Sequence, residues 1–97
     1  MKKTKANTLI QTRFGKMEEP QLHKAEGHIL KGMKIFNELG VKPAYAEGCF
    51  YLGELYADAG QKEKAIEKIK KAEVMFQEMG MDYWLARTKK VLEMVRI

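Results

Sequence analysis

Two histidines and one cysteine are the residues of this 97-residue chain best suited to chemistry, as metal ligands or as a nucleophile. His23 and His28 are five residues apart, which places them about 140° apart around a helix. A zinc pair on a helix needs two histidines four residues apart, on one face. The spacing argues against a metal site, and we expect neither a metal nor a cofactor.

Cys49 is the only cysteine, so the chain cannot form an internal disulfide. It occupies an apolar position of a predicted helix and has no histidine at a defined spacing, which favours a buried, inert thiol over a nucleophile. A single cysteine fits a reducing compartment, and we expect a cytoplasmic protein. The sequence contains no glycine-rich phosphate loop and no carboxylate pair isolated among apolar residues. We therefore expect that the chain is not an enzyme.

The segments that carry these residues form a repeat with a period of forty residues. Residues 24–56 align with residues 64–96 without a gap. The matches include Lys24-Ala25 with Lys64-Ala65, Phe36-Asn37-Glu38-Leu39-Gly40 with Phe76-Gln77-Glu78-Met79-Gly80, and Leu52 with Leu92. Such an offset is typical of a helical repeat array, in which each unit buries its apolar face only against its neighbours.

The spacing of apolar residues predicts four helices, over about 20–39, 43–59, 62–79 and 82–96. Gly40 and Gly80 stand where a left-handed residue ends a helix. Loops this short force successive helices to pack antiparallel. We expect an all-α, antiparallel helix-turn-helix stack of about four helices that forms one domain over residues 19–97.

The second and third helices carry a recognisable motif, Cys49-x2-Leu52-Gly53-x2-Tyr56 followed by Ala65-x3-Ile69. This motif resembles the tetratricopeptide repeat, in which small residues stand where two helices cross closely. The period of forty residues exceeds the usual 34, and Cys49 stands in place of the usual tryptophan.

The segment from Met75 to Leu85 is similar to the C-terminal end of the repeat array in large bacterial signalling proteins that carry a nucleotide-cyclase or ATPase domain. The resemblance implies a non-catalytic protein–protein interaction or scaffolding module. We expect its partner to be a protein or peptide.

The two ends of the stack differ in sequence. Lys89, Glu93 and Arg96 stand where the first copy has buried-type residues, so the last helix should cap the stack against water. The first helix lacks a preceding partner, which predicts an exposed apolar surface at Leu22, Ile29, Met33 and Phe36. We expect the chain to self-associate there as a two-fold homodimer. The alternative is that the N-terminal arm folds back over this surface.

The resemblance also implies that the first helix of each pair lines a concave face. The residues expected on this face are Glu47, Phe50, Tyr51, Glu54, Arg87, Lys90 and Met94. The two aromatic residues suggest a peptide-binding strip, with ordinary packing between longer helices as the alternative. Glu47 and Glu54 disfavour an acidic peptide tail as the ligand.

The net charge of +5 is concentrated at the N-terminus. Residues 1–18 contain five basic residues and one acidic residue, whereas the remaining 79 residues contain 13 basic and 12 acidic residues. We expect a flexible basic arm, and binding of nucleic acid or an anionic surface through this arm is the alternative function. No apolar run approaches the roughly 18–20 residues that cross a bilayer, so we expect no membrane partner.

Overall fold

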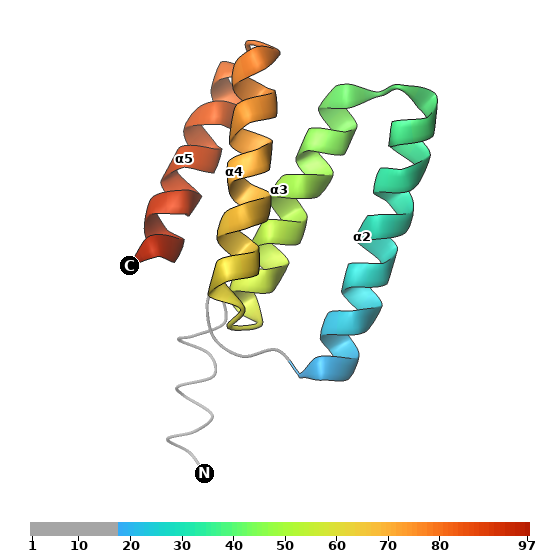
Figure 1. Ribbon diagram of the computed structural model, residues 1–97, viewed down its shortest axis with the longest axis vertical. Coiled ribbons are helices and arrows are strands. Elements are labelled where there is room, and N and C mark those ends of the chain that lie inside the picture. Colours follow the sequence, from blue (N-terminus) through green and yellow to red (C-terminus); the bar gives the residue numbers. More distant parts are fainter. Residues whose placement is uncertain (1–17) are drawn as a thin grey trace.

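The computed structural model describes residues 18–97, and within this range it contains four α-helices and no strand (Figure 1). The helices are α2 (Glu19–Leu39), α3 (Lys42–Asp58), α4 (Lys62–Glu78) and α5 (Asp82–Arg96). Successive helices run antiparallel and form an all-α stack of helical hairpins, which confirms the predicted fold class. Every predicted helix boundary lies within one residue of the observed one. Except for Glu18, the predicted basic arm lies outside the described residues.

Each turn between helices contains one glycine in the left-handed conformation. The φ angles are 73° at Gly40, 79° at Gly60 and 67° at Gly80, a region that side-chain-bearing residues rarely adopt. After the first of these glycines, the Val41 N–H donates a 2.9 Å hydrogen bond to the Phe36 carbonyl. This bond satisfies a carbonyl that the helix end would otherwise leave without a partner. The glycines therefore fix where the helices end.

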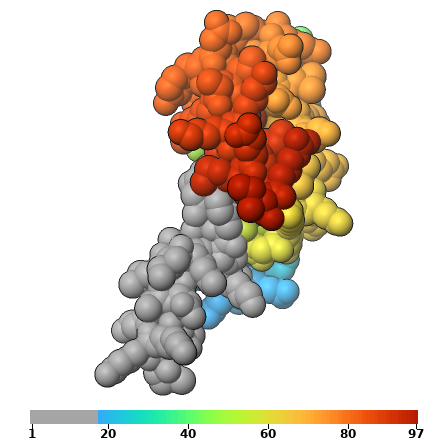
Figure 2. Space-filling view, turned by 90° about the vertical axis from the view of Figure 1, so that its left-hand side faces the viewer, coloured from blue at the N-terminus to red at the C-terminus, as the bar shows by residue number. Residues whose placement is uncertain are grey.

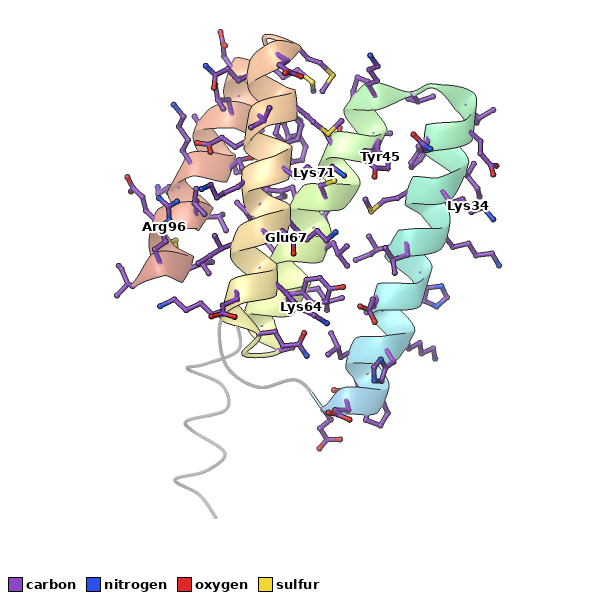
Figure 3. The ribbon with its side chains drawn as sticks, in the orientation of Figure 1. Lys34, Tyr45, Lys64, Glu67, Lys71 and Arg96 are labelled. Carbon is purple, nitrogen blue, oxygen red and sulfur yellow. The ribbon has the colours of Figure 1, made fainter. Side chains whose placement is uncertain are left out.

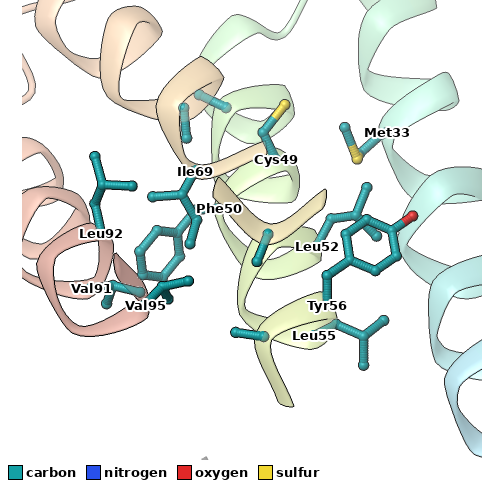
Figure 4. Close-up of a cluster of buried hydrophobic side chains, with 14 of the residues drawn as sticks. Met33, Cys49, Phe50, Leu52, Leu55, Tyr56, Ile69, Val91, Leu92 and Val95 are labelled. Carbon is teal, nitrogen blue, oxygen red and sulfur yellow. The ribbon is translucent and has the colours of Figure 1, made fainter. Parts of the chain in front are cut away.

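The core is centred on α3, which packs against all three of the other helices. Among the described helices, α2 packs against α3 alone, whereas α4 packs between α3 and α5. Four large side chains at the centre are completely buried, namely Phe50, Leu52, Ile69 and Phe76. Figure 4 shows that Phe50 and Ile69 lie between α5 and the remaining helices, while Tyr56 points toward α2.

Small residues set the distance between the packed helices. A Cβ atom at Gly53 would lie 2.4 Å from Cγ1 of Ile69 and 3.2 Å from the carbonyl oxygen of Ala65. These separations leave no room for a side chain. The close crossing of α3 and α4 that Gly53 and Ala65 predict is therefore present.

The exposed surface expected on the first helix is only partly present. Leu22 is 3% exposed and Met33 is 6% exposed, so the expectation is wrong for these two residues. Both side chains belong to the core, because α2 packs against α3. The sequence argument had not assigned α3 as their partner. Ile29 is half-buried, and Phe36 remains 37% exposed. Of the four predicted residues, only Ile29 and Phe36 therefore lie on the open part of α2.

The other end of the stack is polar. The side chains of Lys89, Glu93 and Arg96 are exposed on α5. Figure 2 shows this side of the molecule, and Arg96 points away from α4 in Figure 3. These residues correspond by the forty-residue offset to the buried Cys49 and Tyr56 and to Gly53. The helix α5 thus presents a charged outer side where a further repeat would need an apolar one.

Candidate protein-interaction surfaces

His23 lies beside Glu26 on α2. Nδ1 of His23 lies 3.6 Å from Oε1 of Glu26, a pairing that carries charge on both partners only when the histidine is protonated. The described part of the chain contains no group of three or more histidine, cysteine, aspartate or glutamate side chains placed to hold a metal ion. None of its helices has both the length and the apolar character that crossing a membrane requires.

Cys49 lies in the core, as its position in the repeat predicts. Its side chain is 1% exposed, and burial raises the pKa of the thiol above its ordinary value. The positive charges of Lys71 and Lys68 oppose this rise only in part. The reactive form of cysteine is the thiolate, so this environment disfavours nucleophilic chemistry.

Glu26 and Tyr56 form a polar link between α2 and α3. The Tyr56 hydroxyl donates a hydrogen bond to the Glu26 carboxylate, and this bond is the main cause that lowers the pKa of Glu26. Burial, followed by the same hydrogen bond, raises the pKa of Tyr56 to about 12. Nζ of Lys64 lies 5.3 Å from the centroid of the Tyr56 ring. The group therefore joins α2, α3 and α4.

A second lysine of α4 packs on a tyrosine of α3 in the same manner. Nζ of Lys71 lies 5.5 Å from the centroid of the Tyr45 ring. Figure 3 shows Lys64, Glu67 and Lys71 following one another along α4, on the side that faces Tyr45 and α2. All three side chains are exposed, so this side of α4 is a charged surface.

The residues expected on the concave face divide into exposed and buried groups. Tyr51 and Met94 are each 41% exposed, whereas Phe50 is completely buried. The expectation is therefore wrong for Phe50, because side chains of α5 cover its ring. The remaining four are exposed or half-buried, namely Arg87, Lys90, Glu47 and Glu54.

Met94 lies apart from the aromatic residues of this face. With Val95 and Ile97 of the C-terminal end, it borders a depression of about 400 Å³ that Ala57 and Gly60 line from the end of α3. Tyr51 lies instead on the middle of α3, near the start of α5. The structure brings together only part of the predicted strip.

Aromatic side chains of α3, α4 and α5 form a cluster that reaches the surface at Tyr51 and Tyr83. The ring of Trp84 stacks on Phe76 with centroids 5.4 Å apart and meets Phe50 edge-on at 5.6 Å. It also contacts Tyr51 at 6.0 Å and Tyr83 at 6.1 Å, both edge-on. Trp84 itself is half-buried, and Tyr83 is 72% exposed.

Arg87 lies across this cluster. The carbon centre of its guanidinium is 5.1 Å from the Phe50 centroid and 5.1 Å from the Trp84 centroid. A guanidinium on two aromatic faces gains from cation–π attraction and keeps its N–H donors free to point outward. Sequence reasoning identified Arg87 but missed Tyr83 and Trp84. The signal that would have found them is their spacing of four and three residues before Arg87, which makes each a neighbour of Arg87 on the helix surface.

A separate groove of about 260 Å³ lies between α2 and α3. Its α2 side is formed by His28, Ile29, Gly32, Met33 and Phe36, and its α3 side by Ala44, Glu47, Gly48 and Tyr51. Two of the four residues predicted for self-association, Ile29 and Phe36, are thus partly open at this groove. The other two are buried within the chain's own core.

Comparison with known protein families, with curated proteins and with solved structures finds no match for this chain. The resemblance to tetratricopeptide repeats therefore stays a prediction from the motif. The alternative function, binding of nucleic acid or an anionic surface, depends on a basic arm that lies outside the described residues.

Proposed function

We propose that the chain is a non-catalytic protein–protein interaction module of the tetratricopeptide type, which holds a peptide segment of its partner on the face shared by α3 and α5. The observation that supports this proposal is the stacking of Arg87 on Phe50 and Trp84, between the exposed rings of Tyr51 and Tyr83. A few residues carry most of the binding energy at protein interfaces, and tyrosine, tryptophan and arginine are enriched among them.

The arrangement favours a peptide of mixed charge. Arg87 offers donors to a carboxylate or a backbone carbonyl, and its contacts with two rings reduce the side-chain entropy that binding would cost. Glu47 lies one helical turn before Tyr51 on α3 and offers an acceptor to a basic side chain. The proposal includes a reducing, cytoplasmic setting, which the single buried thiol favours, and a role in signalling, which the resemblance suggests.

A displayed peptide library selected on the wild-type protein tests this function. Trp84 is the only tryptophan, so its fluorescence provides a direct titration signal at the proposed site. We expect the selected peptides to bind the Arg87→Ala and Tyr83→Ala variants at least about tenfold more weakly, as hot-spot truncation does. Val74→Ala is the matched control, because Val74 is 53% exposed on α4, outside the aromatic cluster. Selected peptides that bind all of these variants equally would contradict the proposal.

A further inference from the structure

The internal repeat allows the same helix face to be compared at two positions in the stack. In α4 the strip formed by Ala65, Ile69, Ala72 and Phe76 is completely buried. These residues correspond by the forty-residue offset to Ala25, Ile29, Gly32 and Phe36 of α2. None of these four is fully buried, and Phe36 is 37% exposed. In α4 this strip packs against Gly53 of α3. Among residues 18–97, no helix takes the corresponding position against the strip of α2.

The open strip continues along most of α2. Ile35 is 49% exposed and Leu39 is 70% exposed, and both lie within about 60° of Gly32 around the helix. A Cβ atom at Gly32 would meet nothing within 4 Å. The strip is therefore apolar apart from one histidine and has its smallest residue at its centre. It consists of Ala25, His28, Ile29, Gly32, Ile35, Phe36 and Leu39.

Head-to-tail stacking cannot cover this strip favourably. In such an array, α5 of one copy would take the place of the helix that precedes α2 in the next copy. Its outer side carries Lys89, Glu93 and Arg96, all exposed. Burying these charges against Ile29 and Phe36 would cost free energy without supplying a partner for them.

We propose that a second copy of the chain covers the strip through an antiparallel, two-fold symmetric contact between the two α2 helices, centred on Gly32. In this register Ala25 of one copy faces Leu39 of the other, Ile29 faces Ile35, and His28 faces Phe36. The small side chain of Ala25 thus meets the large side chain of Leu39 at both ends of the contact. The two glycines face each other at the axis and allow the helices to approach closely.

The sequence of the strip supports this occupant because the strip is complementary to itself. A two-fold contact requires one surface patch to match its own rotated copy. The small residue Ala25 lies seven positions before Gly32, and the large residue Leu39 lies seven positions after it. The strip and the peptide site share one groove at Tyr51. Arg87 and Tyr83 lie on α5, away from the strip, so their variants test peptide capture separately from the α2 contact.

Two glycines of α2 provide a matched test. Gly27 and Gly32 both have open space at the Cβ position, but they lie about 140° apart around the helix. Gly32→Glu would place two carboxylates together at the two-fold axis, whereas Gly27→Glu adds the same charge on the side of α2 away from the strip. Sedimentation equilibrium over roughly micromolar to hundred-micromolar concentrations measures dimerisation. We expect the wild type and Gly27→Glu to be dimers, and the dissociation constant of Gly32→Glu to rise at least about 100-fold.

Cysteine crosslinking tests the register. We expect Gly32→Cys to form an intermolecular disulfide under mild oxidation, because the Cα atoms of a disulfide must lie within about 7 Å of each other. Gly27→Cys should not, and the native Cys49 is buried in either variant. Helix content by circular dichroism verifies that each variant is folded. A monomeric wild type, or equal dissociation of the Gly27→Glu and Gly32→Glu dimers, would overturn the proposal and leave peptide capture intact. Crosslinking at Gly27→Cys instead of Gly32→Cys would overturn the register.

Discussion

The hydroxyl of Tyr56 on α3 donates a hydrogen bond to the carboxylate of Glu26 on α2, thirty residues earlier in the chain. Tyr56 is 5% exposed, and the Glu26 side chain is 22% exposed. The bond therefore lies at the edge of the core, where α2 meets the rest of the stack. Since α2 packs against α3 alone among the described helices, this bond bears on how firmly α2 is held.

Removing the hydroxyl should weaken this attachment. We expect Tyr56→Phe to lower the free energy of unfolding by about 1 kcal/mol, the usual net value of one hydrogen bond. The ring stays in place, so packing in the core should change little. Urea denaturation measures the change. Tyr83→Phe is the matched control, because Tyr83 is 72% exposed, and it should leave stability unchanged.

Burial of Tyr56, together with its hydrogen bond to Glu26, should make stability fall at high pH. The pKa of Tyr56 in the folded chain is raised to about 12 from an ordinary value of 10.0. The folded chain thus holds this proton more tightly than the unfolded chain does. The stabilisation is complete below pH 10 and is lost as the pH rises from about 10 to about 12. Denaturation at several pH values in this window should show the free energy of unfolding of wild type falling toward that of Tyr56→Phe. A constant difference would contradict the assignment.

An opposite dependence is expected in acid. The pKa of Glu26 is lowered from its ordinary value, chiefly by the hydrogen bond from Tyr56. Its contribution to stability is present above the carboxyl's ordinary pKa and is lost as the pH falls through the lowered value. Glu26→Gln should therefore narrow the difference in stability between neutral and acidic pH, measured by urea denaturation at each pH. A Glu26→Gln variant with the same difference between neutral and acidic pH as wild type would contradict this assignment.

The close crossing of α3 and α4 gives a contrast between two glycines. We expect Gly53→Ala to destabilise the fold by about 2 kcal/mol, because overpacking against Ile69 and the Ala65 carbonyl outweighs the better helix propensity of alanine. Gly27→Ala brings the same improvement in helix propensity, and its Cβ atom meets no neighbour within 4 Å. It should therefore stabilise the fold by about 1 kcal/mol. Thermal unfolding of both variants measures the contrast. Equal effects of the two substitutions would show that Gly53 is not required for the crossing.

Sequence reasoning predicted the helices closely because local signals mark their ends. Gly40 and Gly80 are separated by the repeat period, and both have the left-handed conformation that ends a helix. The repeat also predicted the burial of Cys49 and the polar outer side of α5. Helix ends depend on residues that are close in sequence, and the burial of Cys49 and the polar side of α5 follow from comparing the two copies of the repeat.

The errors arose where burial depends on how helices pack. Phe50 was assigned to an open face, yet Trp84 and Arg87 cover its ring from thirty-odd residues away. Leu22 and Met33 were assigned to an exposed surface, but the packing of α2 against α3 buries them. Apolar spacing identifies the apolar side of a helix and does not determine which part of that side a neighbour covers.

The polar outer side of α5 should be what prevents the stack from growing. We expect the combined substitution of Lys89→Leu, Glu93→Ala and Arg96→Leu to allow α5 of one copy to dock on the open strip of α2 in the next. Because such a contact does not close on itself, it should produce oligomers larger than dimers that grow with concentration. Sedimentation velocity measures their size. Adding Gly32→Glu to the triple variant should abolish the growth, since it places a charge in the receiving strip. Growth that persists with Gly32→Glu would show that the new apolar surface aggregates by itself and that α2 does not receive it.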